Sequence, residues 1–324
     1  MSLFRFFCIL GVLFTTIVVT PVHAQEYPNK PVHVIIPYGA GGSTDILGRI
    51  IFDKVGKNMG AVFVVDNKPG AGGQIGVVSL VKSSPDGYTL LVDGNPPFIQ
   101  PAIMEKMPYD TFRDLAPVAY AARIPSVLVV TPKLPVKTVP ELFEYAKSKK
   151  APLTFGCSAM GNLSYFAGEM LIGATGGDIE IVSGRGSAQI ISDMLAGYMH
   201  LTIDNLPPYL PQIRADKFRA LATTGDVRAT QLPDLPTMIE AGYPEFHISA
   251  KFGVYAPTGT PRPIIEKLGR EIIAALKSAD VQNRLVQSGF EPVGLGPEEL
   301  WQTMKAEAEK WMRVAKERNI KKMR

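Results

Sequence analysis

The sequence predicts an α/β fold with two lobes, and three observations lead to this prediction. The chain has 324 residues, whereas a single hydrophobic core usually stops growing at about 250–300 residues. Short apolar segments typical of buried strands alternate with segments of helical period, and Gly- or Pro-containing turns separate them. Such alternation is typical of parallel sheets covered by helices. With 46% hydrophobic and 20% charged residues, the composition is that of an ordinary folded domain.

The N-terminus has the features of a secretory signal peptide. Arg5 precedes apolar runs at 6–14 and 17–19, and a short stretch suited to cleavage ends at Ala24. A membrane anchor is the alternative interpretation, but the apolar segment is shorter than the roughly 20 residues that span a bilayer. We therefore expect 1–24 to be a signal peptide that is cleaved after Ala24, which leaves a soluble protein in the periplasm.

The net charge and the cysteine content indicate neither a nucleic-acid partner nor a disulfide-stabilised fold. Loss of Arg5 with the signal peptide leaves 33 basic residues against 30 acidic ones, a net charge of +3. A nearly neutral chain of this size does not indicate a nucleic-acid partner. Cys8 is also lost, so Cys157 remains as a single cysteine and no intrachain disulfide can form.

The first part of the chain contains three expected strands and two expected helices. An apolar strand ends at Pro37, Ser43 opens a helix, and the Pro85-Asp86-Gly87 segment is a strong turn signal. The expected strands are 32–36, 62–65 and 88–92, and the expected helices are 43–55 and 74–82.

The middle of the chain repeats the alternation and predicts a second lobe. The apolar stretches 115–122 and 127–130 are expected to be the strands that cross into it. The expected helices that follow are 139–149, 163–173, 188–197 and 207–214, and the expected strands are 153–155, 179–182, 201–203 and 218–223.

The last part returns to the first lobe through a strand at 251–256. Thr260 is expected to cap a helix that starts at Pro261, because proline is favoured at the first helical position. After a further helix, a final one starts near Pro297. Its apolar residues are spaced by three and four, as in an amphipathic helix that packs on a lobe; they are Trp301, Met304, Ala308 and Trp311.

The segment 37–45 carries the clearest indication of a ligand. It follows a strand, contains Gly39, Gly41 and Gly42, and opens a helix. Glycine lets the backbone approach a ligand closely, and the first amides of a helix have no intrahelical partner and favour an anion. The alternative is a flexible loop with Ser43 or Asp45 as a simple helix cap. Turns of this kind in α/β folds are common ligand sites, so we expect ligand contact here.

Signals for an enzyme are weak. The GxxxxGK[ST] phosphate loop is absent, and the glycines at 39–44 and 70–76 only approximate GxGxxG. HExxH and GxSxG do not occur, no carboxylate cluster indicates a metal, and His33 and His200 fall on expected strands, where a structural role is the commoner one. Cys157 has no histidine nearby in the sequence and fits a small buried side chain. We therefore expect no catalytic residues, no metal and no cofactor.

The expected second lobe offers matching turns after its strands. The segments 156–164 and 183–187 are rich in Gly, Ser and Asn, and Asp204-Asn205 ends a further strand. Each turn alone could be a helix cap or a ligand contact. Together with the first-lobe turn they form opposed polar rims suited to an anion. Arg185 could add positive charge there or form a surface ion pair.

An ordered set of motifs resembles the Bug family, the extracytoplasmic receptors of tripartite tricarboxylate transporters. The similarity covers essentially the whole chain after residue 24, and its set of motifs is specific although each motif alone is modest. The motifs are Tyr27-Pro28-Asn29-Lys30-Pro31, the segment 37–45, Asn67–Gly73, Pro85–Leu91, Arg113–Val118, Asp204–Pro207, Arg219–Ala222 and Ala256–Pro261.

The resemblance implies a two-lobed periplasmic binding protein (Venus flytrap) fold, in which crossing strands join two sheet-and-helix domains. Lobe 1 would combine 25–123 with 248–324, and lobe 2 would be 124–247. It implies a monomer that binds a small carboxylate solute and delivers it to membrane permease subunits. Asp45 would mainly fix its own loop, because its charge would repel an anion. The ligand-binding residues implied by position are Tyr38, Ala40, Gly41, Gly42 and Asp45 in lobe 1, and Ser158, Asn162, Ser164, Gly186, Ser187 and Asp204 in lobe 2.

Two departures from the family pattern bear on the ligand. Lys251 stands where an aromatic residue is usual, and Ser183-Gly184 stands where an aromatic or apolar residue is usual. Lys251 on the cavity wall would favour additional negative charge on the ligand. Two alternative functions stay open: a ligand sensor for a signalling partner, and a nucleotide-using α/β enzyme with its nucleotide at 39–44.

Overall fold

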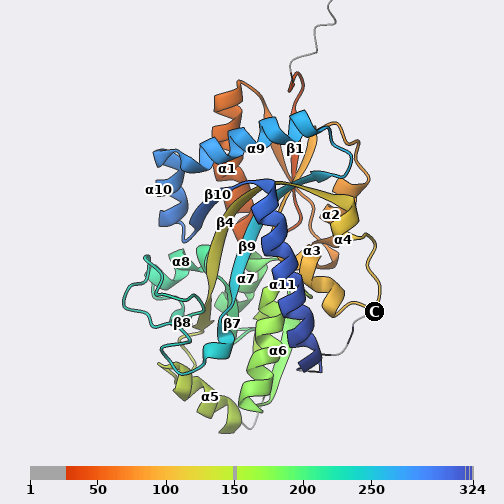
Figure 1. The fold of residues 1–324 in the computed structure, drawn as a ribbon. Helices are drawn as coiled ribbons and strands as arrows, with labels where there is room; N and C mark the ends of the chain where they lie inside the picture. Colours follow the sequence, from red (N-terminus) through yellow and green to blue (C-terminus); the bar gives the residue numbers. More distant parts are fainter. Residues whose placement is uncertain (1–26, 149–151, 318, 321, 323–324) are drawn as a thin grey trace, which may run out of the picture.

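The computed structural model describes residues 27–148, 152–317, 319–320 and 322. Within them the chain forms two α/β lobes, and one mixed sheet of ten strands passes through both lobes (Figure 1). The expected signal peptide at 1–24 lies outside the described residues. The strand order along the main path is β2-β1-β3-β9-β4-β7-β5-β6, and β8 and β10 also pair with β4.

The upper lobe in Figure 1 is built on the parallel strands β2-β1-β3. The apolar residues of β1 and β3 are buried under the helices, as expected from the strand–helix alternation, while those of β2 are half-buried. The elements are β1 (Val32–Ile36), α1 (Ser43–Met59), β2 (Phe63–Asn67), η1 (Ala71–Gly73), α2 (Gln74–Val81), β3 (Thr89–Asp93), α3 (Pro96–Ile99), η2 (Gln100–Ala102) and α4 (Thr111–Asp114).

The lower lobe repeats the pattern, with β5 parallel to both β6 and β7. Its expected helices and strands are all present, with ends that differ by one or two residues. The elements are α5 (Val139–Ser148), β5 (Leu153–Cys157), α6 (Leu163–Thr175), β6 (Ile179–Ser183), α7 (Ser187–Ala196), β7 (Leu201–Asn205), α8 (Leu206–Arg214), β8 (Arg219–Thr223) and η3 (Pro244–Phe246).

Two long antiparallel strands, β4 (Leu115–Val130) and β9 (Ser249–Pro257), connect the lobes. The stretches 115–122 and 127–130, expected as separate strands, form the single strand β4. Pro125 does not end it, because this residue pairs in register with Ser249 of β9. Register shifts around Pro117 and Tyr120 show where the strand bends instead.

The C-terminal region adds α9 (Arg262–Lys277), α10 (Ala279–Gln287), β10 (Glu291–Leu295) and α11 (Pro297–Glu317). The expected cap at Thr260 is wrong: Pro261 is the N-cap, and the Thr260 hydroxyl donates to the Pro257 carbonyl at 2.8 Å. With Thr260 as N-cap, the third helical residue would be Pro263, which has no N–H to donate to the threonine side chain. No described helix is both long and apolar enough to span a membrane.

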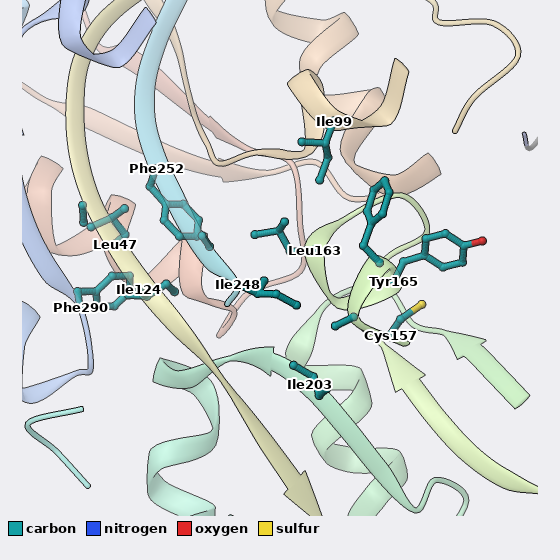
Figure 2. Close-up of a cluster of buried hydrophobic side chains, with 14 of the residues drawn as sticks. Leu47, Ile99, Ile124, Cys157, Leu163, Tyr165, Ile203, Ile248, Phe252 and Phe290 are labelled. Carbon is teal, nitrogen blue, oxygen red and sulfur yellow. The ribbon is translucent and has the colours of Figure 1, made fainter. Parts of the chain in front are cut away.

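Helix α11 is in contact with both lobes. It runs down the molecule beside α6 of the lower lobe (Figure 1). The Trp311 ring lies 4.9 Å from the Phe166 ring of α6, measured between centroids. One buried cluster extends from Leu47 in the upper lobe through Ile124 and Ile248 to Ile203 in the lower lobe (Figure 2). The apolar core is therefore continuous through the crossing strands.

Candidate functional site

A cavity lies between the two lobes where the carboxyl ends of their strands meet. Its empty volume is about 510 Å³ including the mouth, which opens to solvent. Its wall comes from turns of both lobes and from β9. The lining residues are Tyr38, Gly42, Ser43, Thr44, Asp93, Gly94, Asn95, Pro96, Ser158, Asn162, Leu163, Ser164, Gly186, Ser187, Asp204, Asn205, Ala250 and Phe252.

The wall contains eight of the eleven residues implied by the family resemblance and omits three of them. The three that do not line the cavity are Ala40, Gly41 and Asp45. Ala40 and Gly41 are exposed on the outer side of the turn. The next residues, Ser43 and Thr44, take their place on the wall.

Asp45 holds the first-lobe turn in shape. Its Oδ2 accepts a hydrogen bond from the Gly41 amide at 2.9 Å, and its Oδ1 accepts from Arg49 and Asn67. Burial alone would raise the pKa of this carboxyl, but the three donors outweigh it and the pKa is lowered. The ionised carboxylate therefore fixes the turn that presents the N-terminus of α1 to the cavity.

Four helices of nine or more residues begin at the wall. The N-caps of α1, α7 and α8 are Gly42, Gly186 and Asn205, and none of them makes a side-chain cap hydrogen bond. In α6 the Asn162 Oδ1 accepts from the Tyr165 amide. A helix N-terminus carries partial positive charge and unpaired amides, so the converging ends favour an anionic group between them. The contribution of α8 is mainly its dipole, because Pro207 and Pro208 in its first turn have no N–H.

The second-lobe wall is organised around the buried carboxylate of Asp204. Its Oδ1 accepts from the Ser158 hydroxyl at 3.0 Å and from the Asn205 amide at 2.8 Å, and its Oδ2 accepts from the Tyr209 hydroxyl at 3.1 Å. The Asn162 amide in turn donates to Ser158 Oγ at 2.7 Å. Burial raises the pKa of Asp204 despite these donors.

The two lobes touch beyond the cavity. The Gly39 amide donates to the Arg185 carbonyl at 3.4 Å, and a Cβ built on Gly72 would lie 2.5 Å from the Met160 carbonyl oxygen. Gly72 has a φ of +63°, which also favours glycine. These cross-lobe contacts describe a closed arrangement.

An outer cavity of about 1030 Å³ empty volume lies next to the inner one, and Tyr38 lines both. The residues that depart from the family pattern, Ser183 and Gly184, line this outer cavity together with Arg185. Arg185 is exposed, and its side chain makes no ion pair or hydrogen bond with the residues that the structure describes. The alternative of a surface ion pair therefore does not apply within that part of the chain.

The structure adds residues to the wall that sequence reasoning missed. The segment Asp93–Pro96 starts at the last residue of β3, and Ala250 and Phe252 come from β9. The Asp-Gly-Asn-Pro sequence after an apolar strand is a turn signal at the same edge of the sheet as Gly42. It could therefore have been found, whereas the place of β9 depends on the tertiary fold.

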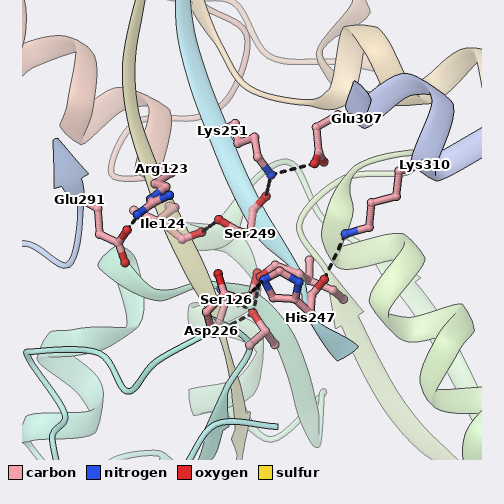
Figure 3. A network of polar contacts seen from close by, with 12 residues as sticks. Arg123, Ile124, Ser126, Asp226, His247, Ser249, Lys251, Glu291, Glu307 and Lys310 are labelled. Atoms are coloured by element: carbon pink, nitrogen blue, oxygen red, sulfur yellow. Dashed lines mark hydrogen bonds and ion pairs between the residues drawn. The ribbon is translucent and has the colours of Figure 1, made fainter. Parts of the chain in front are cut away.

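Lys251 is not on the cavity wall. Ala250 and Phe252 line the cavity, so the residue between them faces the other side of the strand. Its ammonium lies 2.7 Å from Glu307 of α11 (Figure 3). Asn95 of the wall donates to the same carboxylate at 2.7 Å and accepts from the Lys251 amide at 2.8 Å. The charge of Lys251 is thus paired with Glu307 and does not act directly on a ligand.

The groups considered for catalysis occupy structural places. Cys157 is buried, and burial raises the pKa of its thiol to about 12, which disfavours the nucleophilic thiolate. His33 pairs with Asp66 at 2.8 Å, and His200 accepts from the Thr154 amide. No group of three or more metal-ligating side chains is found in the part of the chain that the structure describes.

The fold and cavity define a solute-binding protein, with two α/β lobes closed on a small polar chamber. The sequence profile of the tripartite tricarboxylate transporter family receptor matches residues 47–320. The chain belongs to this family. Membership confirms the predicted family and the prediction of a receptor rather than an enzyme.

Known proteins resemble the chain along most of its length. Protein BugT of Bordetella pertussis is 35% identical over 324 residues, which is 99% of both chains. The structure of the periplasmic binding protein BugD matches with a TM-score of 0.88 and 31% identity, over 92% of this chain and 100% of that one. An R. palustris protein with adipate matches with a TM-score of 0.89 and 35% identity, over 92% and 100%. The two-lobed fold is therefore confirmed.

Proposed function

We propose that the protein captures a small carboxylate-containing solute between its lobes and delivers it to the membrane subunits of a tripartite tricarboxylate-type transporter. The observation that carries this proposal is the convergence of four helix N-termini on the inner cavity. Among the described residues, no Lys, Arg or His lines that cavity. Amides and hydroxyls, such as those of Ser43, Thr44 and Ser187, would therefore hold the carboxylate. The adipate bound to the R. palustris protein supports the ligand class.

Ligand capture is expected to be a hinge closure about β4 and β9. Arg123 of β4 pairs with Glu291 of β10, whereas Ser126 pairs with Asn205 of β7. The change of partners within three residues supports a boundary between lobes at 123/124. We therefore retain lobes of 25–123 plus 248–324 and of 124–247. A ligand that contacts both walls would shift the equilibrium towards the closed form.

The proposal includes export to the periplasm after cleavage at Ala24, and action as a monomer. Membership of a transporter-receptor family, whose relative BugD is a periplasmic binding protein, supports this place of action. N-terminal sequencing of the exported protein and its mass in solution would test both points.

Thermal-shift measurements on the purified protein test the central claim. After co-purified ligand is removed, a panel of mono-, di- and tricarboxylates is compared with nucleotides. We expect at least one carboxylate at millimolar concentration to raise Tm by several degrees, since ligand binding to the native state stabilises it by mass action. Stabilisation by a nucleotide and by none of the acids would contradict the proposal.

A further inference from the structure

Asp93 stands out on the first-lobe wall of the cavity. It ends β3, is fully buried and lines the inner chamber. Its Oδ1 accepts a hydrogen bond from the Gly94 amide at 2.7 Å. Its Oδ2 is buried and has no hydrogen-bond partner in regular geometry among the described residues. A buried carboxyl oxygen without a partner costs free energy, so this atom is a site where a bound molecule could add an interaction.

The surroundings of Asp93 are polar but do not satisfy it. The Tyr38 hydroxyl lies close enough to the carboxyl to make a weak hydrogen bond that lowers the pKa of Asp93, although its geometry is not regular. The hydroxyls of Tyr109 and Tyr255 interact with the carboxyl electrostatically. Each hydroxyl is itself buried without a hydrogen-bond partner in regular geometry. Burial raises the pKa of Asp93 to about 8, so the site resists carrying an uncompensated negative charge.

The charges on the cavity wall indicate which kind of ligand group Asp93 can bind. Its ionisable side chains other than Tyr38 are Asp93 and Asp204, both acidic, and no basic side chain among the described residues accompanies them. The Asp204 oxygens already accept three hydrogen bonds. Asp93 Oδ2 is thus the carboxyl oxygen on this wall that lacks a hydrogen bond of regular geometry. Neighbouring atoms cover it in the closed form, and because Asp93 lines the chamber, a ligand bound there is the source from which a donor can reach it.

We propose that Asp93 is a specificity-determining residue whose Oδ2 accepts a hydrogen bond from an amine or hydroxyl of the ligand. The ligand is then a carboxylic acid that carries such a donor close to its carboxylate, an amino acid or a hydroxy acid. This inference rests on the proposed function and deepens it. It also separates this chain from the R. palustris relative with adipate, because adipate has no donor apart from its carboxyl groups.

Calorimetric titration with two matched ligand series tests the inference. One series is succinate, malate and aspartate; the other is adipate, 2-hydroxyadipate and 2-aminoadipate. Within a series the carbon chain is constant and only the donor changes. For the wild-type protein we expect at least one donor-bearing acid to bind ten or more times tighter than its unsubstituted parent.

Variants of Asp93 assign that preference to its side chain. In Asp93→Ala the preference should fall to less than about threefold, because the acceptor is gone. In Asp93→Asn the amide oxygen still accepts, so a hydroxyl preference should survive and an amine preference should fall about tenfold. Asp178→Asn, at an exposed aspartate outside the cavity, is the matched control. Ratios measured within one protein are insensitive to a general loss of stability.

Each other outcome overturns the inference in a recognisable way. Equal affinities for parent and donor-bearing acids in the wild type would remove the proposed selection. A preference that survives in Asp93→Ala would assign it to another residue. An equal loss of succinate and malate in that variant would show that Asp93 contacts the carboxylate itself. If no acid in either series or in the wider panel binds the wild type, the proposed function fails as well.

Discussion

The two walls of the cavity each present a buried aspartate at the end of a strand, and the two residues differ in their hydrogen bonds. Asp204 follows the apolar part of β7 and accepts from Ser158, Asn205 and Tyr209. Asp93 ends β3 and accepts from its own neighbour Gly94, while its second oxygen has no partner in regular geometry in the described structure. The two residues are of the same type and are equally buried, but more hydrogen-bond donors contact Asp204 than Asp93.

This difference separates a structural acid from one that is available to a ligand. A buried polar group with all its partners stabilises the local fold, whereas one without partners lowers stability until something binds. The Asp204 cluster of the second-lobe wall is therefore expected to be preformed, whereas the buried Ser164 hydroxyl on the same wall has no partner among the described residues. The first-lobe wall is expected to complete its hydrogen bonds when ligand arrives.

Matched isosteric substitutions give the largest expected effect on this comparison. Asp204→Asn should lower the free energy of unfolding by about 2 kcal/mol, because an NH2 group would replace an oxygen that accepts from buried donors. Asp93→Asn should gain stability at neutral pH, because it removes a buried carboxyl whose pKa is raised to about 8. Urea unfolding of both variants checks the pair. Equal losses of stability would show that the two acids are equivalent.

A substitution at the contact between the walls tests whether both act together. In Gly72→Ala the new Cβ would meet the Met160 carbonyl of the other lobe at 2.5 Å and the flexible end of Gln100 in its own lobe at 2.9 Å. The contact with Met160 disfavours the closed form. We expect ligand affinity to fall about tenfold, or roughly 1.4 kcal/mol.

Gly60→Ala is the matched control for this substitution. Its φ of +60° is close to the +63° of Gly72, but its Cβ would point into open space. Both variants should lose about 1 kcal/mol of stability from backbone strain, and only Gly72→Ala should lose affinity. A parallel loss of affinity in both would rule out the cross-lobe contact as the cause.

The pH dependence of stability tests Asp93 by itself. Since the pKa of Asp93 is raised to about 8 in the folded protein, the unfolded chain binds fewer protons above about pH 4 and folding weakens as pH rises towards 8. Ligand-free wild type should therefore lose more than about 1 kcal/mol relative to Asp93→Asn over this window. Asp204 and the tyrosines that face Asp93 are present in both proteins, so their contributions to the pH dependence cancel in the difference between the two stability curves.

Chemical denaturation at several pH values between 4 and 9 provides the measurement. Parallel stability curves for wild type and Asp93→Asn would contradict the raised pKa. They would also weaken the contrast between the two walls.

Sequence reasoning found the parts of the site that depend on local chemistry. The glycines at 39–42 and the small polar residues at 156–164 and 183–187 mark strand-to-helix turns, whose conformational requirements are visible in the residue types. The order of strands and helices was also predictable, because buried strands and amphipathic helices differ in apolar period. The turn-fixing role expected for Asp45 agrees with its hydrogen bond to Gly41.

What sequence reasoning missed depends on tertiary contacts. The expected strand 88–92 stopped one residue before Asp93, and nothing local shows that Oδ2 of this residue lacks a donor. The direction of Lys251 could have been inferred from its neighbours, since side chains alternate along a strand. Its partner Glu307, 56 residues away in sequence, could not. The continuity of β4 through Pro125 likewise depends on pairing with distant strands.

The packing of α11 against the lower lobe provides a built-in optical reporter. The sequence has two tryptophans. Trp301 makes edge-to-face contacts with Phe98 and Phe112 of the upper lobe, while Trp311 lies against Phe166 of α6 and donates to Glu307. If the lobes separate as proposed, the environment of the Trp311 indole changes while that of Trp301 does not. The emission spectrum of a Trp301→Phe protein would then follow opening directly, without any attached dye.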